Sequence, residues 1–556
     1  MSMHRDNPLQ DRHVRKSLRL LSFVLALCLL ALLALSLTAV SQTQPVRLSG
    51  SLGVSTELYS SSSSDPQWTP RSDQHVSRAV LRTTLTLYDQ IDLPFEAYIS
   101  TQSSGYHQPF NQFGVSPLIA GWLRLHGGYF SSRVSELTFG DERLLGGGID
   151  MSPGPWRITA LYGRARQGLA PDTAAGFGGD YRRMVTAAKV GYGKEGEFFL
   201  HLNAMRATDD TATFRVDEGR LAPAARENTT ASLGFGFPVG TVVRIAGEAA
   251  LSHTINDLRV RSRDGYTAQV DGAAKVNLLI MPAQSWQVAL NSRWIGPGYF
   301  SLGYVQLPND VFEFTLAPMV RLSEQRMHVR GSLGVMFNNL RNNRLARTTR
   351  LIGSLSGSWQ ISEQLGISTN YSNYGMRSTH TKDSLRIDHL THSLYLSPTY
   401  TFDGFGGDNS INLNLMVQSA TDGNPVTTEG NKNSSEALSL MHTLLFPSTL
   451  SLTTGVTWNS MASSFSDTRI LSFTETVGHN FFNNTLSTSL TGGYNIVSTA
   501  TTEDTQFSLR LSLGYTIEDY GTLSLALSNN NYSYGQSVDR PSYDEWFGSL
   551  QYSVGF

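Results

Sequence analysis

Charged side chains recur at alternate positions along much of the chain, in phase opposite to apolar residues. On the lipid side of a membrane strand, each such charge would cost about 2–4 kcal/mol near the middle of the bilayer. Their phase therefore assigns them to the inside of a barrel, where a wall rich in arginine favours anionic and polar solutes. The candidate lumen-lining residues are Arg157, Arg244, Glu248, Arg293, Glu313, Arg321, Arg326, His328, Arg330 and Arg510.

A second interpretation of these charges stays open, in which a plug or neighbouring strands hold them and no solute passes. Arg244 and Glu248 lie four residues apart on one strand face, a separation of roughly 13 Å that is too long for a direct ion pair. Ion pairs among the candidate residues would therefore have to form between strands.

The sequence contains no motif of a hydrolase or of a metal site. His389 and His392 are three residues apart, so in a strand they point to opposite faces and do not chelate one ion. Cys28 is the only cysteine and lies in the N-terminal apolar run, so the remainder of the chain has no thiolate ligand and no disulfide. There is no G-x-S-x-G elbow and no H-E-x-x-H. We therefore expect no enzyme activity, no cofactor and no metal.

The elements that carry the charged residues are predicted to be β-strands, because apolar residues recur with a period of two. A clear example runs from Phe507 to Tyr515, where Phe and Leu alternate with Ser, Arg and Gly. About two dozen such stretches lie between Val46 and Phe556. The alternation fits either a soluble sandwich or propeller, or a membrane barrel whose apolar face meets lipid.

Several features favour the membrane barrel. The predicted strands are about 10–13 residues long, whereas strands of soluble proteins usually have 5–6 residues. Long polar connections alternate with tight turns, which is typical of outer-membrane barrels. Aromatic residues that would suit an interfacial girdle lie near strand ends. They are Trp286, Trp294, Trp359, Trp458, Tyr494, Tyr515 and Trp546.

Residues 1–41 are predicted to be a cleaved signal peptide. A basic stretch from Arg12 to Arg19 precedes the apolar run Leu20–Leu37, and Ala39-Val40-Ser41 offers small residues to a signal peptidase. The alternative is a transmembrane anchor, because the run approaches the ~20 residues that span a bilayer. Residues 1–41 contain five of the 43 basic and two of the 45 acidic residues, which leaves a net charge of −5 for residues 42–556. That balance does not indicate nucleic-acid binding.

The last eleven residues carry apolar or small side chains at every second position. This stretch resembles the C-terminal recognition strand of Gram-negative outer-membrane β-barrels, which typically closes with Phe. The resemblance implies an outer-membrane location, contact with outer-membrane lipid, and periplasmic chaperones and the barrel-assembly machinery as partners. The residues that match the assembly signal are Trp546, Leu550, Tyr552, Val554 and Phe556.

The regular alternation is interrupted between about 104 and 156 and again between about 270 and 320. Each interruption means either a miscounted strand or a segment that leaves the wall. The nominal count is 26 strands, and correction for both interruptions gives 24. We therefore predict an all-β protein with one transmembrane antiparallel up-and-down β-barrel over residues 42–556, with about 24 strands and a range of 22–26.

The segment 104–155 differs most from the rest. Gly146, Gly147 and Gly148 are consecutive, and such a run within a strand indicates a bulge, a bend or a close backbone contact. Two interpretations stay open: an inward-folded or constricting segment, or wall strands with a kink. The motifs FGVSP, WLRLHGGY and LLGGGID are similar to a stretch in outer-membrane barrel proteins of Bacteroidota-like bacteria. This resemblance implies a barrel and no defined activity.

The function predicted from the sequence is a porin-like passive channel for polar solutes in the outer membrane of a Gram-negative bacterium. The alternative is a non-conducting scaffold that acts on surface partners through its extracellular loops. A TonB-dependent receptor is less compatible, because it would carry a plug domain before its first strand. Here the stretch Leu48–Thr56 already alternates as a strand just after the predicted signal peptide.

Overall fold

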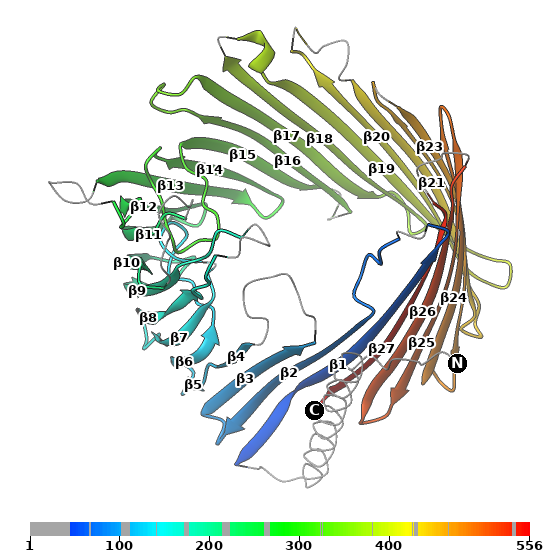
Figure 1. The fold of residues 1–556 in the computed structure, drawn as a ribbon, viewed down its shortest axis with the longest axis horizontal. Helices are drawn as coiled ribbons and strands as arrows, with labels where there is room; N and C mark the ends of the chain where they lie inside the picture. Colours follow the sequence, from blue (N-terminus) through cyan, green and yellow to red (C-terminus); the bar gives the residue numbers. More distant parts are fainter. Residues whose placement is uncertain are drawn as a thin grey trace, which may run out of the picture.

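The computed structural model describes residues 45–65, 68–101, 112–140, 142–171, 177–213, 223–260, 267–322, 324, 326–380, 382–424, 426, 432–464, 466–535 and 541–556. Most of these residues belong to one antiparallel sheet that closes into a barrel (Figure 1). The predicted signal peptide lies outside the described residues. In the part of the chain that the structure describes, no helix is long and apolar enough to cross a membrane.

The sheet contains 27 strands, and one short 3-10 helix, η1 (Asp383–Leu385), lies in a connection. The first fourteen strands are β1 (Val46–Ser63), β2 (His75–Leu87), β3 (Ile91–Ser100), β4 (Gln112–Val115), β5 (Leu118–Ile119), β6 (Leu123–Phe130), β7 (Leu144–Met151), β8 (Trp156–Arg166), β9 (Arg182–Gly193), β10 (Phe199–Asp210), β11 (Glu227–Val239), β12 (Val243–Ile255), β13 (Ala268–Ala283) and β14 (Trp286–Ile295). The others are β15 (Val311–Leu322), β16 (Met327–Asn338), β17 (Ala346–Gln360), β18 (Leu365–His380), β19 (Asp388–Gly404), β20 (Gly407–Asp422), β21 (Asn433–Leu445), β22 (Ser451–Ala462), β23 (Asp467–Phe481), β24 (Leu486–Thr499), β25 (Glu503–Ile517), β26 (Gly521–Ser533) and β27 (Tyr543–Gly555).

The wall has 26 strand positions, because β4 and β5 share one position between β3 and β6. The wall therefore lies within the predicted range of 22–26 strands, two above the central value of about 24. The irregular stretches that prompted the subtraction contain loops between directly paired residues: Phe130 is opposite Leu144, and Ile295 is opposite Val311. These loops leave the wall without changing the direction of the strands that follow, so no strand had to be removed from the count.

The barrel closes where β27 pairs with β1. In this seam Tyr552 lies opposite Val54, and the backbone N–H of Phe556 donates to the carbonyl of Gly50 at 3.0 Å. The alternation predicted for this stretch is confirmed, with Trp546, Leu550, Tyr552, Val554 and Phe556 at positions of one parity. Closure satisfies the backbone groups that an open sheet edge would expose.

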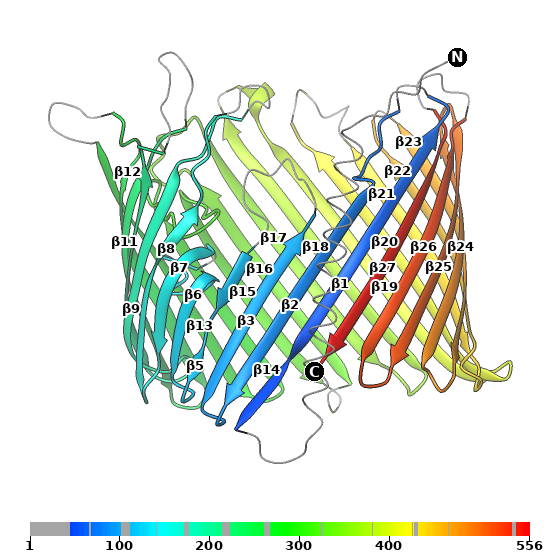
Figure 2. The ribbon, with the colours of Figure 1, turned by 60° about the horizontal axis from the view of Figure 1, so that its bottom comes forward.

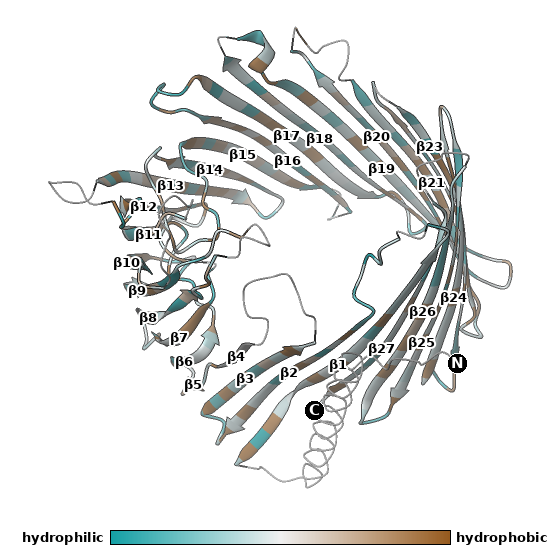
Figure 3. Ribbon diagram, in the orientation of Figure 1, coloured by the Kyte–Doolittle hydropathy of each residue, from teal (hydrophilic) through white to brown (hydrophobic). Residues whose placement is uncertain are grey.

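The two faces of the wall differ in chemistry. On β10, Leu200 and Leu202 point outward and are 47% and 61% exposed, whereas Asn203 and Met205 point inward and are each 2% exposed. Apolar and polar residues alternate along the strands in the hydropathy colouring (Figure 3). An apolar outer face over long strands is the surface that a lipid bilayer requires.

Long connections and short turns lie at opposite ends of the barrel (Figure 2). The tight turns predicted at Phe482-Asn483 and Glu518-Asp519 are confirmed, and they join β23 to β24 and β25 to β26. We call these ends the short-turn end and the long-loop end. The two loops that interrupt the period, between Phe130 and Leu144 and between Ile295 and Val311, both start at the long-loop end.

Candidate functional site: the lumen and its two inner loops

Two long connections fold against the inside of the wall and pack on one another (Figure 1). Part of the β1–β2 connection also lies inside, where Trp68 stacks on Tyr543. The first inner loop comprises residues 131–143, without residue 141, and joins β6 to β7; the second inner loop comprises residues 296–310 and joins β14 to β15. Phe139 and Gly303 form a parallel β-bridge, and the N–H of Gly140 donates to the carbonyl of Gly303 at 3.2 Å. The two loops therefore form one unit.

Side chains of the second inner loop also donate hydrogen bonds to backbone carbonyls of the first. Tyr299 is fully buried, and burial raises the pKa of its phenol above the ordinary value, with the charge of Glu248 acting in the same direction. Tyr299 therefore stays a neutral donor. The donor–acceptor pairs are Tyr299 to Leu137 at 2.7 Å, Tyr304 to Ser135 at 2.5 Å and Ser301 to Thr138 at 2.5 Å.

The inner loops bury apolar side chains against small residues of the wall. Phe139 is fully buried in a cluster with Ala187 and Ala207, and Tyr299 packs near Ala250 and Ala273. Alanine at these inward positions leaves room for the loops. Burial of one phenylalanine side chain contributes about 1.5–3 kcal/mol, so the packing is a substantial part of what holds the loops on the wall.

Polar side chains of the wall anchor the second inner loop through its backbone. Asn228 is fully buried: its amide donates to the carbonyl of Phe300 at 2.9 Å and accepts from the N–H of Leu302 at 3.1 Å. Ser252 donates to the same Phe300 carbonyl at 2.6 Å. Asp271 accepts from the N–H of Gly298 at 2.7 Å. These bonds satisfy loop backbone groups that would otherwise be buried without partners.

The first inner loop covers one of the predicted lumen-lining residues. Glu248 is 5% exposed and accepts a hydrogen bond from the N–H of Glu136 at 3.2 Å. The side chain of Glu136 pairs with Lys275, which lies opposite Glu248 on the neighbouring strand. Glu248 therefore anchors a loop and does not face open water.

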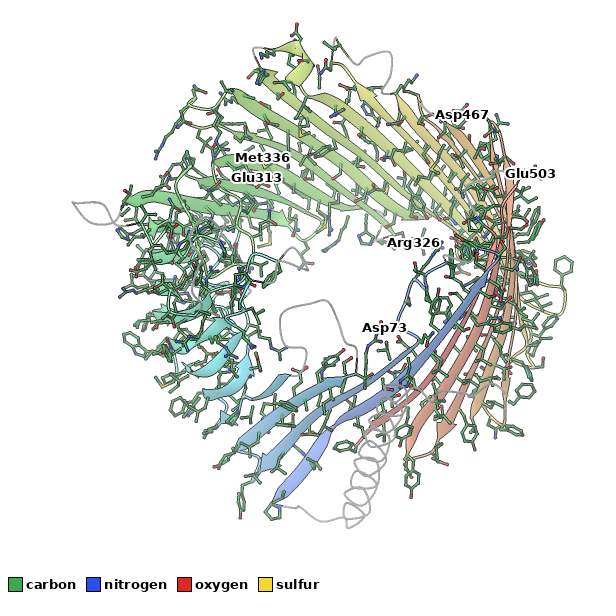
Figure 4. The ribbon with its side chains drawn as sticks, viewed as in Figure 1. Asp73, Glu313, Arg326, Met336, Asp467 and Glu503 are labelled. Atoms are coloured by element: carbon green, nitrogen blue, oxygen red, sulfur yellow. The ribbon has the colours of Figure 1, made fainter. Side chains whose placement is uncertain are left out.

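The strand register places nine of the ten predicted residues at inward positions, and Arg326 lies in the turn just before β16. The ten residues are not brought together at one place. Six of them, Arg157, Arg244, Arg321, Arg326, His328 and Arg330, lie toward the short-turn end. Figure 4 shows Arg326 projecting into the barrel. A hollow of about 430 Å³ is lined in part by Arg321, His328 and Arg330. The inner face at the short-turn end is therefore rich in cationic side chains.

The other four predicted residues occupy separate parts of the wall. Arg293 and Glu313 form a cross-strand ion pair at 2.6 Å, and Glu248 lies under the first inner loop. Arg510 lies on another side of the lumen, beside a hollow of about 1020 Å³ that Ser489, Ser512 and Gln551 also line. It also borders a hollow of about 580 Å³ that is lined in part by Arg71 and Asp73 of the β1–β2 connection. Hydroxyl and amide groups dominate this part of the wall, so its inner face is hydrophilic.

Several inward charges were missed by the sequence reasoning. Glu57 pairs with Arg78 at 2.6 Å, and Arg82 pairs with Glu96 at 3.3 Å, all on β1 to β3. A signal was present, because Arg78 and Arg82 alternate with Ala79, Leu81 and Thr83. The buried pair between Arg183 and Asp209, at 2.7 Å, was also missed.

The segment 104–155, for which an inward element and kinked wall strands were both left open, combines wall strands with one inward loop in its described part. Residues 112–115, 118–119, 123–130 and 144–151 are wall strands, and of the described residues in this segment only the first inner loop leaves the wall to pack inside. The glycine run lies in β7 and permits close contact: a Cβ atom on Gly146 would lie 2.1 Å from the carbonyl oxygen of Tyr162, and one on Gly148 would lie 2.6 Å from Leu161.

A Ser–His–Asp arrangement on the inner wall was not predicted. The Oγ atom of Ser116 lies 2.8 Å from Nδ1 of His126, and Nε2 of His126 lies 2.7 Å from Oδ2 of Asp150. The three residues come from the β4–β5 break, β6 and β7. No local motif contains them, so only strand pairing could have revealed the set.

The structure also places the two histidines considered as a metal pair. His389 lies opposite Met376 and His392 opposite Asn373, which puts them on opposite faces of β19. Among the described residues, no three His, Cys, Asp or Glu side chains are grouped so that they could hold a metal ion.

No family model matches the chain, and no curated protein matches its sequence. The similar solved structures are outer-membrane β-barrels. The chain resembles the E. coli P pilus tip assembly intermediate PapC-PapD-PapK-PapG (11% identity, TM-score 0.47, 93% of this chain and 62% of that chain). It also resembles the FrpB iron transporter from Neisseria meningitidis (11% identity, TM-score 0.40, 91% and 81%) and OccAB4 from Acinetobacter baumannii (12% identity, TM-score 0.30, 65% and 97%).

Likenesses at these identities and TM-scores carry no argument about activity or substrate. The resemblance to barrel proteins of Bacteroidota-like bacteria is not confirmed, because no family model matches.

Proposed function

We propose that this protein is an outer-membrane channel for small polar solutes, with a lumen narrowed by its two inner loops. The observation that carries the proposal is the contrast between the two parts of the inner wall. The inner loops cover part of it, whereas the part around Arg510, Ser512 and Gln551 borders a hollow of about 1020 Å³. A hydrophilic wall that borders a hollow inside a closed barrel suits a water-filled path.

Selection in this channel would depend on width and charge, without a cofactor. The cationic side chains toward the short-turn end, among them Arg321, Arg326 and Arg330, would raise the local concentration of anions. Glu57, Glu96 and Glu313 are each paired with an arginine, so they do not cancel that effect. The proposed preference is for anionic and neutral polar solutes over cations.

The proposed location is the outer membrane of a Gram-negative bacterium, with the long-loop end outside. The apolar outer face would contact outer-membrane lipid, and β27 would be the strand that periplasmic chaperones and the barrel-assembly machinery engage. These assignments rest on the outward apolar residues of the wall and on the sequence pattern of β27.

Single-channel recording tests the proposal. The full chain without residues 1–41 is refolded in detergent, checked for heat-modifiable migration on a gel, and added to a planar bilayer. We expect discrete conductance steps, together with swelling of proteoliposomes in small neutral sugars. A folded barrel that gives neither steps nor swelling would contradict the channel and favour the non-conducting scaffold.

A further inference from the structure

We propose that Ser116, His126 and Asp150 form a hydrolytic site on the lumen wall for water-soluble carboxylic esters. This function goes beyond solute passage and departs from the expectation, drawn from the sequence, that the protein is not an enzyme. The Ser116 Oγ to His126 Nδ1 distance is 2.8 Å, and the His126 Nε2 to Asp150 Oδ2 distance is 2.7 Å. A nucleophile, a base and an orienting carboxylate in hydrogen-bond contact define the Ser–His–Asp set by geometry and not by sequence order.

A break in the wall exposes the candidate nucleophile. Ser116 and Pro117 lie between β4 and β5, where proline has no N–H to donate to the ladder. The break is fixed on both sides: the N–H of Ser116 donates to the carbonyl of Pro94 at 3.2 Å, and the N–H of Leu125 donates to the carbonyl of Pro117 at 2.9 Å. Ser116 is half-buried in this position, so its hydroxyl is held near His126 while the residue keeps access to the lumen.

The imidazole of His126 is held in one orientation. Its side chain is 4% exposed, and its ring stacks on Phe130 with 4.8 Å between the ring centroids. His126 lies opposite Gly148 on β7, where a side chain would collide with Leu161. Packing on one side and hydrogen bonds at both ring nitrogens leave the imidazole little freedom to rotate.

The carboxylate of Asp150 is fully engaged as an orienting group. In addition to His126, it accepts hydrogen bonds from Thr159 at 2.5 Å and from Ser132 of the first inner loop at 3.1 Å. An ionised carboxylate that accepts from Nε2–H selects the tautomer with a free lone pair at Nδ1. That lone pair is directed at the hydroxyl of Ser116, which is the arrangement that general-base activation needs.

The proposed reaction is ester hydrolysis in two steps. In the first, Ser116 Oγ bonds to the ester carbonyl carbon while His126 takes the hydroxyl proton. The bond from that carbon to the alkoxy oxygen then breaks, and the alcohol leaves with the proton from His126. In the second, water attacks the acyl group on Ser116, His126 takes a proton from the water, and that proton returns to Ser116 Oγ as the carboxylic acid is released.

The position of the set restricts the substrate to water-soluble esters. Asp150 pairs with Thr159, whose side chain is buried on the inner side of the wall, so the set faces the lumen and not the lipid. Membrane lipids on the outer face cannot reach it. Arg124 lies on the same face as His126, two residues and about 7 Å along the strand, and it is an exposed residue. It is the cation best placed to attract an anionic group of the substrate.

The same hydrogen bonds could serve only to fasten three wall strands and the first inner loop, and active-site labelling separates that role from catalysis. The full-length barrel, checked for heat-modifiable migration, is treated with a fluorophosphonate probe, and the modified peptide is mapped. Hydrolysis of p-nitrophenyl acetate and of dioleoyl phosphatidylcholine is measured in the same preparation. Ser116→Ala removes the nucleophile, and Ser528→Ala is the matched control because Ser528 is an inward-facing serine of β26, opposite Arg510 and outside the set.

We expect the probe on Ser116, hydrolysis of the soluble ester but not of the lipid, and a loss of about 100-fold or more in kcat/KM for Ser116→Ala. Ser528→Ala should keep both the labelling and the activity. A folded wild-type barrel that is not labelled at Ser116 would overturn the proposal, as would equal hydrolysis by wild type and Ser116→Ala. Lipid hydrolysis would overturn the substrate class. Conductance recorded in parallel reports on the channel separately, because it does not require Ser116.

Discussion

Replacement of Phe139 by alanine should loosen the inner loops and widen the channel. Phe139 is fully buried and forms the bridge to Gly303. Truncation of a buried phenylalanine costs about 3–5 kcal/mol. The three side-chain hydrogen bonds between the loops contribute about 1 kcal/mol each, so the loss is as large as their sum. A loss of 3 kcal/mol shifts the docking equilibrium of the loops by roughly 100-fold.

Single-channel recording of Phe139→Ala measures this effect. We expect a larger mean conductance and more open-channel noise than in the wild type, because the loops would leave the wall for part of the time. The matched control is Phe473→Ala, which removes an outward-facing ring that is 44% exposed and leaves the lumen unchanged. Conductance and noise equal to the wild type in a correctly folded Phe139→Ala barrel would refute the claim that the docked loops limit the path.

Three further changes test other parts of the account. Gly303→Ala places a Cβ atom 2.4 Å from the carbonyl oxygen of Thr138, which should weaken the docking of the inner loops by about 1–3 kcal/mol and raise the conductance. Gly53→Ala is the control and should leave the conductance unchanged, because nothing lies within 4 Å of the added atom. Asp209→Asn leaves the buried Arg183 without its charge partner and should lower the stability of the barrel by about 3–5 kcal/mol. The folded band on a gel should then unfold at a lower temperature than in the wild type, and unfolding at the wild-type temperature would contradict this. Arg321→Glu should shift the reversal potential in a salt gradient toward the value of a cation-selective channel. Lys382→Glu, in a long loop, is the comparison, and an equal shift in both variants would argue against selection at the short-turn end.

Periodicity predicted the strands and the inward phase of their charges, whereas strand length and the alternation of long and tight connections favoured a membrane barrel over a soluble sandwich. Stretches such as Phe507–Tyr515 alternate so regularly that only one face of the strand can meet lipid. The corrected count of about 24 strands was too low by two, because two strands were subtracted where the period is interrupted. With the neighbouring strands unknown, the sequence did not show that these interruptions are loops that leave the wall between directly paired residues. The loops carry apolar residues such as Val134 and Leu302. They are buried by contacts with the inner wall and not by lipid.

The residues that meet at the site could not be predicted from the sequence either, because the sequence does not show which strands and loops are neighbours. Asn228 and Ser252 reach the same carbonyl of Phe300 from adjacent strands, and Ser116 meets His126 only because a strand break aligns them. Such contacts depend on register and on loop paths, which are set by packing between segments far apart in the chain. The local signals present were the alanines at inward positions and the interruptions of the period, and these indicated where the wall changes but not what covers it.

Excision of both inner loops tests the central claim most directly. Removal of the whole segment 104–155 would delete β4 to β7 and open the wall. In contrast, Phe130 pairs directly with Leu144, and Ile295 with Val311, so a two-residue Asn-Gly turn can replace residues 131–143 and 296–310 while the wall stays closed. We predict a heat-modifiable barrel with discrete steps of larger conductance than the wild type. An intact barrel whose conductance is unchanged, or one that is silent with and without the loops, would contradict a channel narrowed by them.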